Sequence, residues 1–218
     1  MQRLRRKRLT GCVLLLGALT LTSTAALACP TVSDLTNAGI VVTYEDGSLS
    51  QFRETDDGVV QNDVFSEGTD KGYWIDALYG AYPLSFGFIE KGAVVDADTE
   101  YLAYDRPPDD LKGPTADSYW SGVATILDSQ RQPQERTRIA VSAEAFETVE
   151  IGGCVYEALP MSVLFDDGRN VTLFDYKYLD ALGVAVLVGE SFSGDDFPDR
   201  PEFDYTPVSI EGRSFFSR

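Results

Sequence analysis

The chain has 218 residues, with 35 acidic and 18 basic side chains, a formal net charge of −17 and no histidine. Its acidity disfavours nucleic acids and anionic lipid surfaces as partners. The lack of histidine excludes Ser-His-Asp and Cys-His catalysis and every histidine-ligated metal site. Because 44% of the residues are hydrophobic, the composition suits a folded domain with a core rather than a disordered chain.

Residues 1–28 have the pattern of a secretory signal peptide. Basic residues from Arg3 to Arg8 precede an apolar stretch at 9–21, and Ala26 and Ala28 have the small side chains of a cleavage site. The apolar stretch, about 13 residues, is shorter than the roughly 20 that cross a bilayer. We therefore expect cleavage after Ala28 and a periplasmic protein. Loss of five basic and no acidic residues changes the net charge from −17 to −22 (−17 − 5).

Two cysteines remain after this cleavage, because Cys12 leaves with the signal peptide. Cys29 and Cys154 would enter an oxidising compartment, which predicts one disulfide between them. The long loop that it closes corresponds to on the order of 4 to 5 kcal/mol of stability. The alternative, a lipoprotein with lipid on Cys29, is disfavoured. Ala26 and Leu27 do not match the leucine and the small residue that usually precede a lipidated cysteine.

The first elements of the mature chain are a helical turn and two hairpins. A short polar segment up to Asn37 can form a turn of helix with Thr31 or Ser33 as its N-cap. Alternating apolar residues then predict strands at 40–45, 49–53 and 59–64. Asp-Gly pairs separate these strands at 46–47 and 57–58, and Asp-Gly is a strong hairpin signal.

Residues 73–88 are unusually aromatic, with Gly80 and Pro83 in the middle. Aromatic residues at alternate positions predict a core strand, a bend and a second core strand. The functional alternative is an apolar cleft that takes up a ligand. Its candidate ligand-binding residues are Trp74, Tyr79, Tyr82 and Phe86.

One proline-rich segment near 105–115 interrupts the strand pattern, since proline density excludes a central strand or a helix interior. It could join two half-domains, but its length of about ten residues favours a surface loop. We therefore predict a single antiparallel β domain over 29–218. Further strands are expected at 93–104, 119–127 and 136–141.

Residues 147–190 read as an antiparallel meander. Asp167 and Gly168 predict a two-residue type I′ turn, which needs positive φ at both positions. A corner follows at Leu182-Gly183. The apolar run 184–188 lacks alternation, and its β-branched valines favour a strand covered on both faces.

The segment from Gly152 through Val155 to the Leu182-Gly183 corner is similar to the C-terminal part of uncharacterised bacterial periplasmic β proteins that resemble the lipoprotein-carrier half-barrels. The resemblance covers 148–189. It implies a curved antiparallel sheet around an apolar cavity, and it assigns no catalytic residues. Together with the strand pattern, it leads us to expect a mainly β fold with little helix: a single antiparallel curved sheet, a half-barrel or a β-sandwich.

The acidic segment 191–205 is expected to be a loop. Asp195, Asp196 and Asp199 are its calcium candidates, but their spacing lacks the glycine and the final glutamate of an EF-hand loop. A solvated acidic loop is therefore the favoured interpretation. We expect no metal and no cofactor.

No set of catalytic residues can be assembled from this sequence. We therefore favour an exported, non-enzymatic protein that binds an apolar ligand or an envelope protein partner. The alternative is a carboxylate-dependent, glycosidase-like hydrolase, which would need two carboxyl groups facing one groove.

Overall fold

The structure is a computed structural model that describes residues 28–56, 58–106 and 113–213. The predicted signal peptide lies outside the described residues except for Ala28, and 107–112 of the predicted loop near 105–115 lie outside them too. The described chain is mainly β, with one antiparallel sheet that is not closed and a single short α-helix. This confirms the predicted fold class.

The helix α1 spans Val32–Asn37 and begins at the predicted N-cap Thr31. A 3-10 turn, η1, spans Asp96–Asp98. The strands are β1 (Ile40–Tyr44), β2 (Leu49–Asp56), β3 (Val59–Phe65), β4 (Gly72–Leu78), β5 (Tyr82–Glu90), β6 (Ala93–Val94), β7 (Glu100–Tyr104), β8 (Tyr119–Leu127), β9 (Pro133–Ala143), β10 (Glu147–Ile151), β11 (Cys154–Asp166), β12 (Asn170–Leu179), β13 (Val184–Gly194), β14 (Glu202–Asp204) and β15 (Pro207–Glu211).

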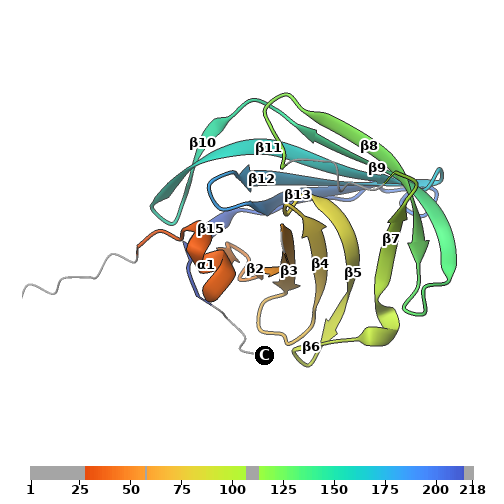
Figure 1. Cartoon of the computed structure of the whole chain (residues 1–218), viewed down its shortest axis with the longest axis horizontal. Helices are drawn as coiled ribbons and strands as arrows, with labels where there is room; N and C mark the ends of the chain where they lie inside the picture. Colours follow the sequence, from red (N-terminus) through yellow and green to blue (C-terminus); the bar gives the residue numbers. More distant parts are fainter. Residues whose placement is uncertain (1–27, 57, 107–112, 214–218) are drawn as a thin grey trace, which may run out of the picture.

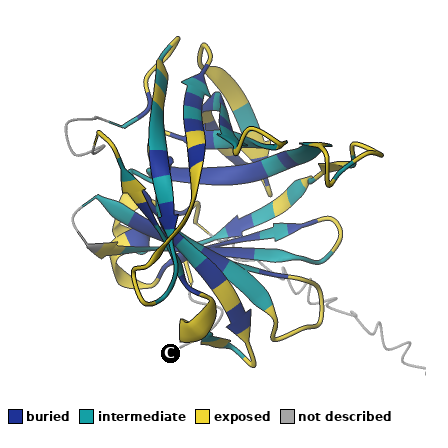
Figure 2. Cartoon of the chain, turned by 90° about the vertical axis from the view of Figure 1, so that its right-hand side faces the viewer, coloured by how far each residue is buried: buried dark blue, intermediate teal, exposed yellow. Residues whose placement is uncertain are grey.

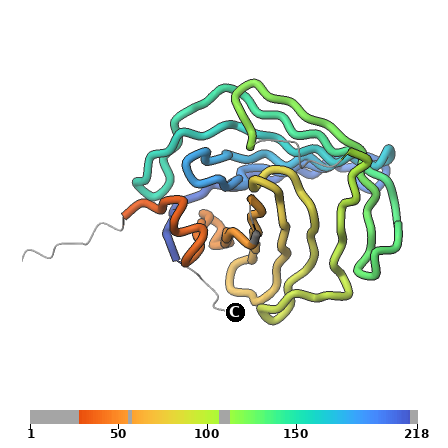
Figure 3. The backbone as a smooth tube through the Cα atoms, viewed as in Figure 1, coloured from red at the N-terminus to blue at the C-terminus, as the bar shows by residue number. Residues whose placement is uncertain are grey.

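The sheet follows the chain almost in order, β14-β13-β12-β11-β9-β8-β7-β5-β4-β3-β2-β1-β15, with β10 beside β11 and β6 beside β5. Figure 1 shows β8, β9, β11 and β12 curving over β2 to β5, with β7 joining the two parts at one side. The backbone trace in Figure 3 follows the same curve. A single sheet thereby supplies two facing walls.

The last strands bring the two edges of the sheet close together. β14 pairs with β13, whereas β15, two residues further on, pairs with β1. Between them, the Tyr205 N–H donates to the Val188 carbonyl at 2.9 Å, and the Thr206 carbonyl accepts from the Glu45 N–H at 2.9 Å. The predicted loop at 191–205 is therefore only partly a loop, because β13 continues to Gly194 and β14 follows.

Two main clusters of buried side chains hold the curved sheet together. The first combines β1 to β3 with β10 to β13 and includes Ile40, Leu179 and Val184, each 0% exposed. The second combines β7, β8 and β9 with β11 and includes Ile139 and Leu159. In Figure 2 the buried residues lie along the strands, while the connecting loops are mostly exposed. The apolar run 184–188 is buried as predicted from Val184 to Leu187, and Val188 is partly exposed.

The predicted disulfide between Cys29 and Cys154 is present, with the two Cα atoms 5.5 Å apart. It ties the residues before α1 to the first residue of β11, and Cys154 belongs to the first core cluster. The Tyr156 hydroxyl adds a hydrogen bond to the Pro30 carbonyl at 3.4 Å. These links attach the start of the described chain to β11 and to the first core cluster.

The turn between β11 and β12 differs from the predicted type I′ turn. Gly168 has φ +87°, but Asp167 does not have positive φ, and the Asp167 N–H donates to the Asn170 carbonyl at 3.2 Å. The two central residues are therefore Gly168 and Arg169, with positive φ only at the first, so the turn is not type I′. The Asp167 carboxylate selects this geometry by accepting the Arg169 and Asn170 N–H groups, each at 2.7 Å.

Candidate functional site: a cavity between the walls of the sheet

A cavity of about 620 Å³ lies between the two parts of the curved sheet. Phe52 and Val60 line it and belong to the first core cluster, while Met161 and Val163 line it and belong to the second. The cavity therefore lies where the two clusters meet but do not fill the space between the walls. This volume is within the range of small-molecule sites in proteins.

Aromatic side chains form much of the wall contributed by β11 and β12. The cross-strand pairs Val163–Phe174 and Phe165–Thr172 place alternate residues of both strands on the cavity face. The rings of Phe165 and Phe174 pack edge to face with centroids 6.0 Å apart. The Tyr176 ring follows at 6.4 Å from Phe174.

The opposite wall comes from β4 and β5. Tyr73, Ile75 and Phe86 line the cavity there, and Ile75 pairs with Phe86 across the two strands. Phe88 also lines the cavity and is 59% exposed, which places the Phe88 side chain where the cavity meets solvent. Both walls are therefore apolar and aromatic at their centres.

A β-bulge brings one carboxylate onto the cavity face. Tyr176 pairs with Leu187, but Asp175 pairs with Gly189, so Val188 is skipped and the alternation of β13 changes phase. Glu190 consequently pairs with Phe174 and lines the cavity. Strict alternation would have placed Glu190 on the other face, and the sequence carries no recognisable signal for this bulge.

Tyrosines surround Glu190. The Tyr205 hydroxyl donates to Glu190 Oε1 at 3.0 Å, and the Tyr205 and Tyr44 rings contact edge to face at 6.1 Å. Burial raises the pKa of Tyr73 well above its usual value, with further contributions from Tyr176 and Glu190. The pKa of Tyr176 is raised as well, first by burial and then by Tyr44 and Glu190. These phenols are therefore neutral hydrogen-bond donors at neutral pH.

Two buried polar atoms of cavity-lining residues have no hydrogen-bond partner among the described residues. One is the Asn62 Oδ1 atom on β3, and the other is the Trp74 Nε1 atom on β4. Trp74 also packs with Phe65 and Ile89 in a third, small cluster. A buried acceptor without a partner is costly, so a ligand donor that reached Asn62 would remove that cost.

The charged side chains that line the cavity are all acidic. Among the described lining residues there is no lysine or arginine, and the acids are Asp98, Glu100, Glu135, Asp167 and Glu190. Burial raises the pKa of the Glu100 carboxyl, and the Glu135 carboxylate raises it further. The cavity is therefore apolar in its walls and negative in its charge.

The four predicted ligand-binding residues separate into two pairs. Trp74 and Phe86 line the cavity. Tyr82 is instead buried in the second core cluster, with its ring 5.6 Å from that of Trp120, and Tyr79 packs against the same cluster from a turn with φ +53°. Because aromatic periodicity identifies a buried face but not which part of that face stays unfilled, the sequence could not separate these pairs.

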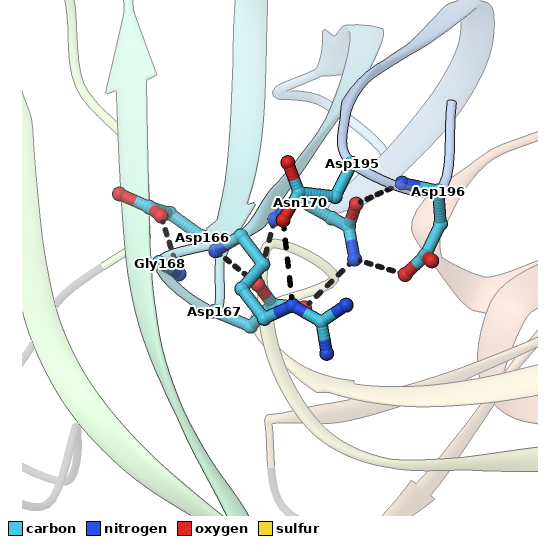
Figure 4. Close-up of polar contacts among 7 residues, drawn as sticks. Asp166, Asp167, Gly168, Asn170, Asp195 and Asp196 are labelled. Atoms are coloured by element: carbon cyan, nitrogen blue, oxygen red, sulfur yellow. Dashed lines mark hydrogen bonds and ion pairs between the residues drawn. The ribbon is translucent and has the colours of Figure 1, made fainter. Parts of the chain in front are cut away.

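The acidic residues 195 and 196 hold two loops together (Figure 4). The Asp195 carboxylate lies 3.6 Å from Arg169 Nε, and Asn170 both donates to Asp196 Oδ2 at 2.7 Å and accepts from the Asp196 N–H at 3.0 Å. These contacts join the β13–β14 connection to the β11–β12 turn. Within the described ranges, no three acidic or cysteine side chains are grouped to hold a metal ion, and the calcium candidates, Asp199 included, are not part of such a group.

No helix among the described residues is both long enough and apolar enough to cross a bilayer. No known protein-family model matches the chain, and no curated protein matches it. A solved structure from Parabacteroides distasonis, described as that of "a putative lipoprotein", aligns with 84% of this chain and all of its own chain. Its TM-score is 0.34 and its sequence identity 9%, so the similarity in fold is weak.

Proposed function

We propose that this protein binds an apolar small molecule in the cavity between the walls of its sheet, without catalysing a reaction on it. The observation that carries this proposal is the cavity of about 620 Å³ with aromatic walls from β4, β5, β11 and β12. Filling this space with side chains would stabilise the protein, because empty apolar volume costs stability. An open cavity walled by apolar and aromatic side chains is therefore best explained by an occupant.

The same proposal places the protein in an oxidising, extracytoplasmic compartment, with the periplasm as the expected one. The Cys29–Cys154 disulfide supports this location, since such bonds persist where thiols are not kept reduced. The signal peptide expected at 1–28 agrees with it. An envelope protein partner would be compatible with this location, but the cavity favours a small molecule.

The neutral fluorescent probe N-phenyl-1-naphthylamine tests the proposal. We expect saturable binding of one probe per chain, with emission shifted to the blue. Ala77 lines the cavity and is 8% exposed, so Ala77→Phe should fill part of it and weaken probe binding about tenfold. The matched control is Ala103→Phe at an exposed position of β7, which should bind as the wild type does. Absence of saturable binding, or equal loss in both variants, would contradict the proposal.

A carboxylate-dependent hydrolase is the second candidate, and one observation favours it. Glu100 and Glu135 both line the cavity, and the pKa of Glu100 is raised by burial and by Glu135. A pair of carboxyl groups facing one cleft is the pattern used by glycosidases. Hydrolysis of chromogenic glycosides that is abolished by Glu100→Gln would support this candidate, and inactivity of the wild type on a broad panel would eliminate it.

A further inference from the structure

We propose that the ligand is an apolar molecule with a positively charged amine or quaternary ammonium group, and that this group lies against Glu190. The inference rests on the proposed binding function and specifies the chemistry of its ligand. It follows from the charge of the cavity, from the aromatic residues around Glu190 and from the hydrogen bonding of the Glu190 carboxylate.

The charge of the cavity disfavours anionic ligands. Its described lining contains five carboxylic acids and no basic residue. A fatty acid carboxylate or a lipid phosphate would enter this space without a counter-ion, and an unpaired charge in an apolar environment is strongly destabilised. A cation would instead meet opposite charges at the opening and inside.

The residues around Glu190 suit an organic cation. Glu190 lies beside Phe174 on β12 and Phe203 on β14, its two cross-strand neighbours. Tyr73 and Tyr176 line the same cavity. The faces of aromatic rings attract ammonium groups, most strongly where water is excluded. Since burial keeps both tyrosines neutral, their rings are available for this contact without adding charge.

The Glu190 carboxylate retains acceptor capacity for such a group. The Tyr205 hydroxyl donates to Glu190 Oε1 at 3.0 Å. A carboxylate has about four acceptor positions on its two oxygens, so this one bond leaves room for an N–H donor of an amine. A quaternary ammonium has no N–H and would contact the same oxygens through its charge alone. An ion pair formed inside the cavity is screened by salt much less than one at the surface.

Three amphiphiles of equal chain length test this inference by displacing N-phenyl-1-naphthylamine, each below its micelle concentration or, for decanol, below its solubility limit. They are decyltrimethylammonium, decanol and decanoate. We expect decyltrimethylammonium to displace the probe at about tenfold lower concentration than decanol, and decanoate to be the weakest. The preference should persist at high ionic strength, although the net charge of −17 attracts every cation to the surface.

Glu190→Gln provides the decisive variant, because an amide oxygen still accepts from Tyr205 but carries no charge. In this variant decyltrimethylammonium and decanol should displace the probe at about the same concentration, while probe affinity stays within about twofold of the wild type. Glu202→Gln, on an exposed position of β14, is the matched control and should retain the preference. Thermal melting checks that both variants fold.

The outcomes separate the two proposals. Probe binding with equal displacement by all three amphiphiles, or with decanoate strongest, would overturn the cationic ligand but keep the binding function. If high salt abolishes the cation preference of the wild type, or if Glu202→Gln abolishes it, the preference comes from surface charge and the inference is overturned. A probe that does not bind the wild type would overturn both.

Discussion

The two core clusters and the cavity are built from the same strands and the same kinds of side chain, yet they differ in how completely space is filled. In the first cluster Ile40, Leu179 and Val184 are 0% exposed. Across the cavity, Ile75 and Phe174 are only half-buried although they project from central strands of the sheet. An open volume of about 620 Å³ lies between the side chains of the two walls.

This difference separates stability from binding. The first cluster is closed on one side by α1, by β10 and by the disulfide. Among the described residues that line the cavity there is none from α1 and neither disulfide cysteine, and the exposed Phe88 is one of the lining residues. Changes at cluster residues that do not line the cavity should therefore lower stability with little effect on ligand affinity. Changes at cavity residues outside the clusters should do the reverse.

The largest loss of stability should come from removing the disulfide. Cys29→Ser with Cys154→Ser removes a link across a sequence separation of 125 residues, and we expect a loss of about 4 to 5 kcal/mol in the free energy of unfolding. Urea denaturation measures this loss, and Cys29→Ser alone should lose as much as the double variant. Probe affinity of the folded fraction should be unchanged. A loss under about 1 kcal/mol would mean that the disulfide contributes little to the stability of the first cluster.

Truncation of one side chain in each region compares them directly. Leu179→Ala in the first cluster should cost about 3 to 5 kcal/mol, because the surrounding packing cannot close the new cavity. Ile75→Ala at the cavity should cost only about 1 to 2 kcal/mol, since Ile75 already has open space on one side. Ile75→Ala should weaken probe binding, and Leu179→Ala should not. Equal stability losses would argue that the cavity is closed in solution.

Alkaline pH should test the burial of Tyr44 in the first cluster. Burial raises the pKa of Tyr44 to about 12, above the usual value of about 10 for tyrosine. The stability from the neutral phenol is therefore fully present below about pH 10 and is lost as the pH rises towards 12. We expect the free energy of unfolding to fall by about 2 kcal/mol through Tyr44 alone over this range.

Tyr44→Phe should flatten this fall, and Tyr119→Phe, at a residue 69% exposed, should not. Denaturation at a series of pH values makes the comparison. The difference between variants is measured from the pH slope, since Tyr44→Phe also removes the hydrogen bond to Ser50 Oγ at 3.2 Å. An identical slope in Tyr44→Phe and the wild type would contradict the assignment.

The smallest effect is expected at the β11–β12 turn near the opening. Gly168 has φ +87°, so Gly168→Ala should cost about 1 kcal/mol. Gly189 does not have positive φ, and a Cβ there would meet Asp175 Cβ at an ordinary 3.6 Å. Gly189→Ala should therefore be tolerated. Thermal melting compares the two variants. Equal stability of Gly168→Ala and Gly189→Ala would contradict the positive φ at Gly168.

Most of the fold could be predicted because the residues that alternate along each predicted strand are also the ones that the folded sheet buries. Alternation and Asp-Gly pairs predicted the hairpins of β1 to β3 and of β11 and β12. The two cysteines that follow the expected cleavage site predicted the disulfide. The type of turn at Gly168 was wrong because the Asp167 side chain bonds to the backbone and displaces the turn by one residue. Such competition is not encoded in residue propensity.

The candidate site was predicted less completely. Trp74 and Phe86 were named from the aromatic run, but the opposite wall with Phe174 and Glu190 was not. Its position depends on how far the sheet curves and on the bulge at Val188. Both are properties of long-range packing, so no local pattern in β12 or β13 reports them.

Native mass spectrometry of the protein purified from its own cells tests the central claim most directly. The account predicts that part of the wild-type population carries one additional small mass, which is organic and is released by collisional activation. Ala77→Phe should lose this mass, and Ala103→Phe should keep it. A wild-type protein that is always bare, or an adduct that Ala77→Phe retains in full, would contradict the claim that the cavity holds a ligand.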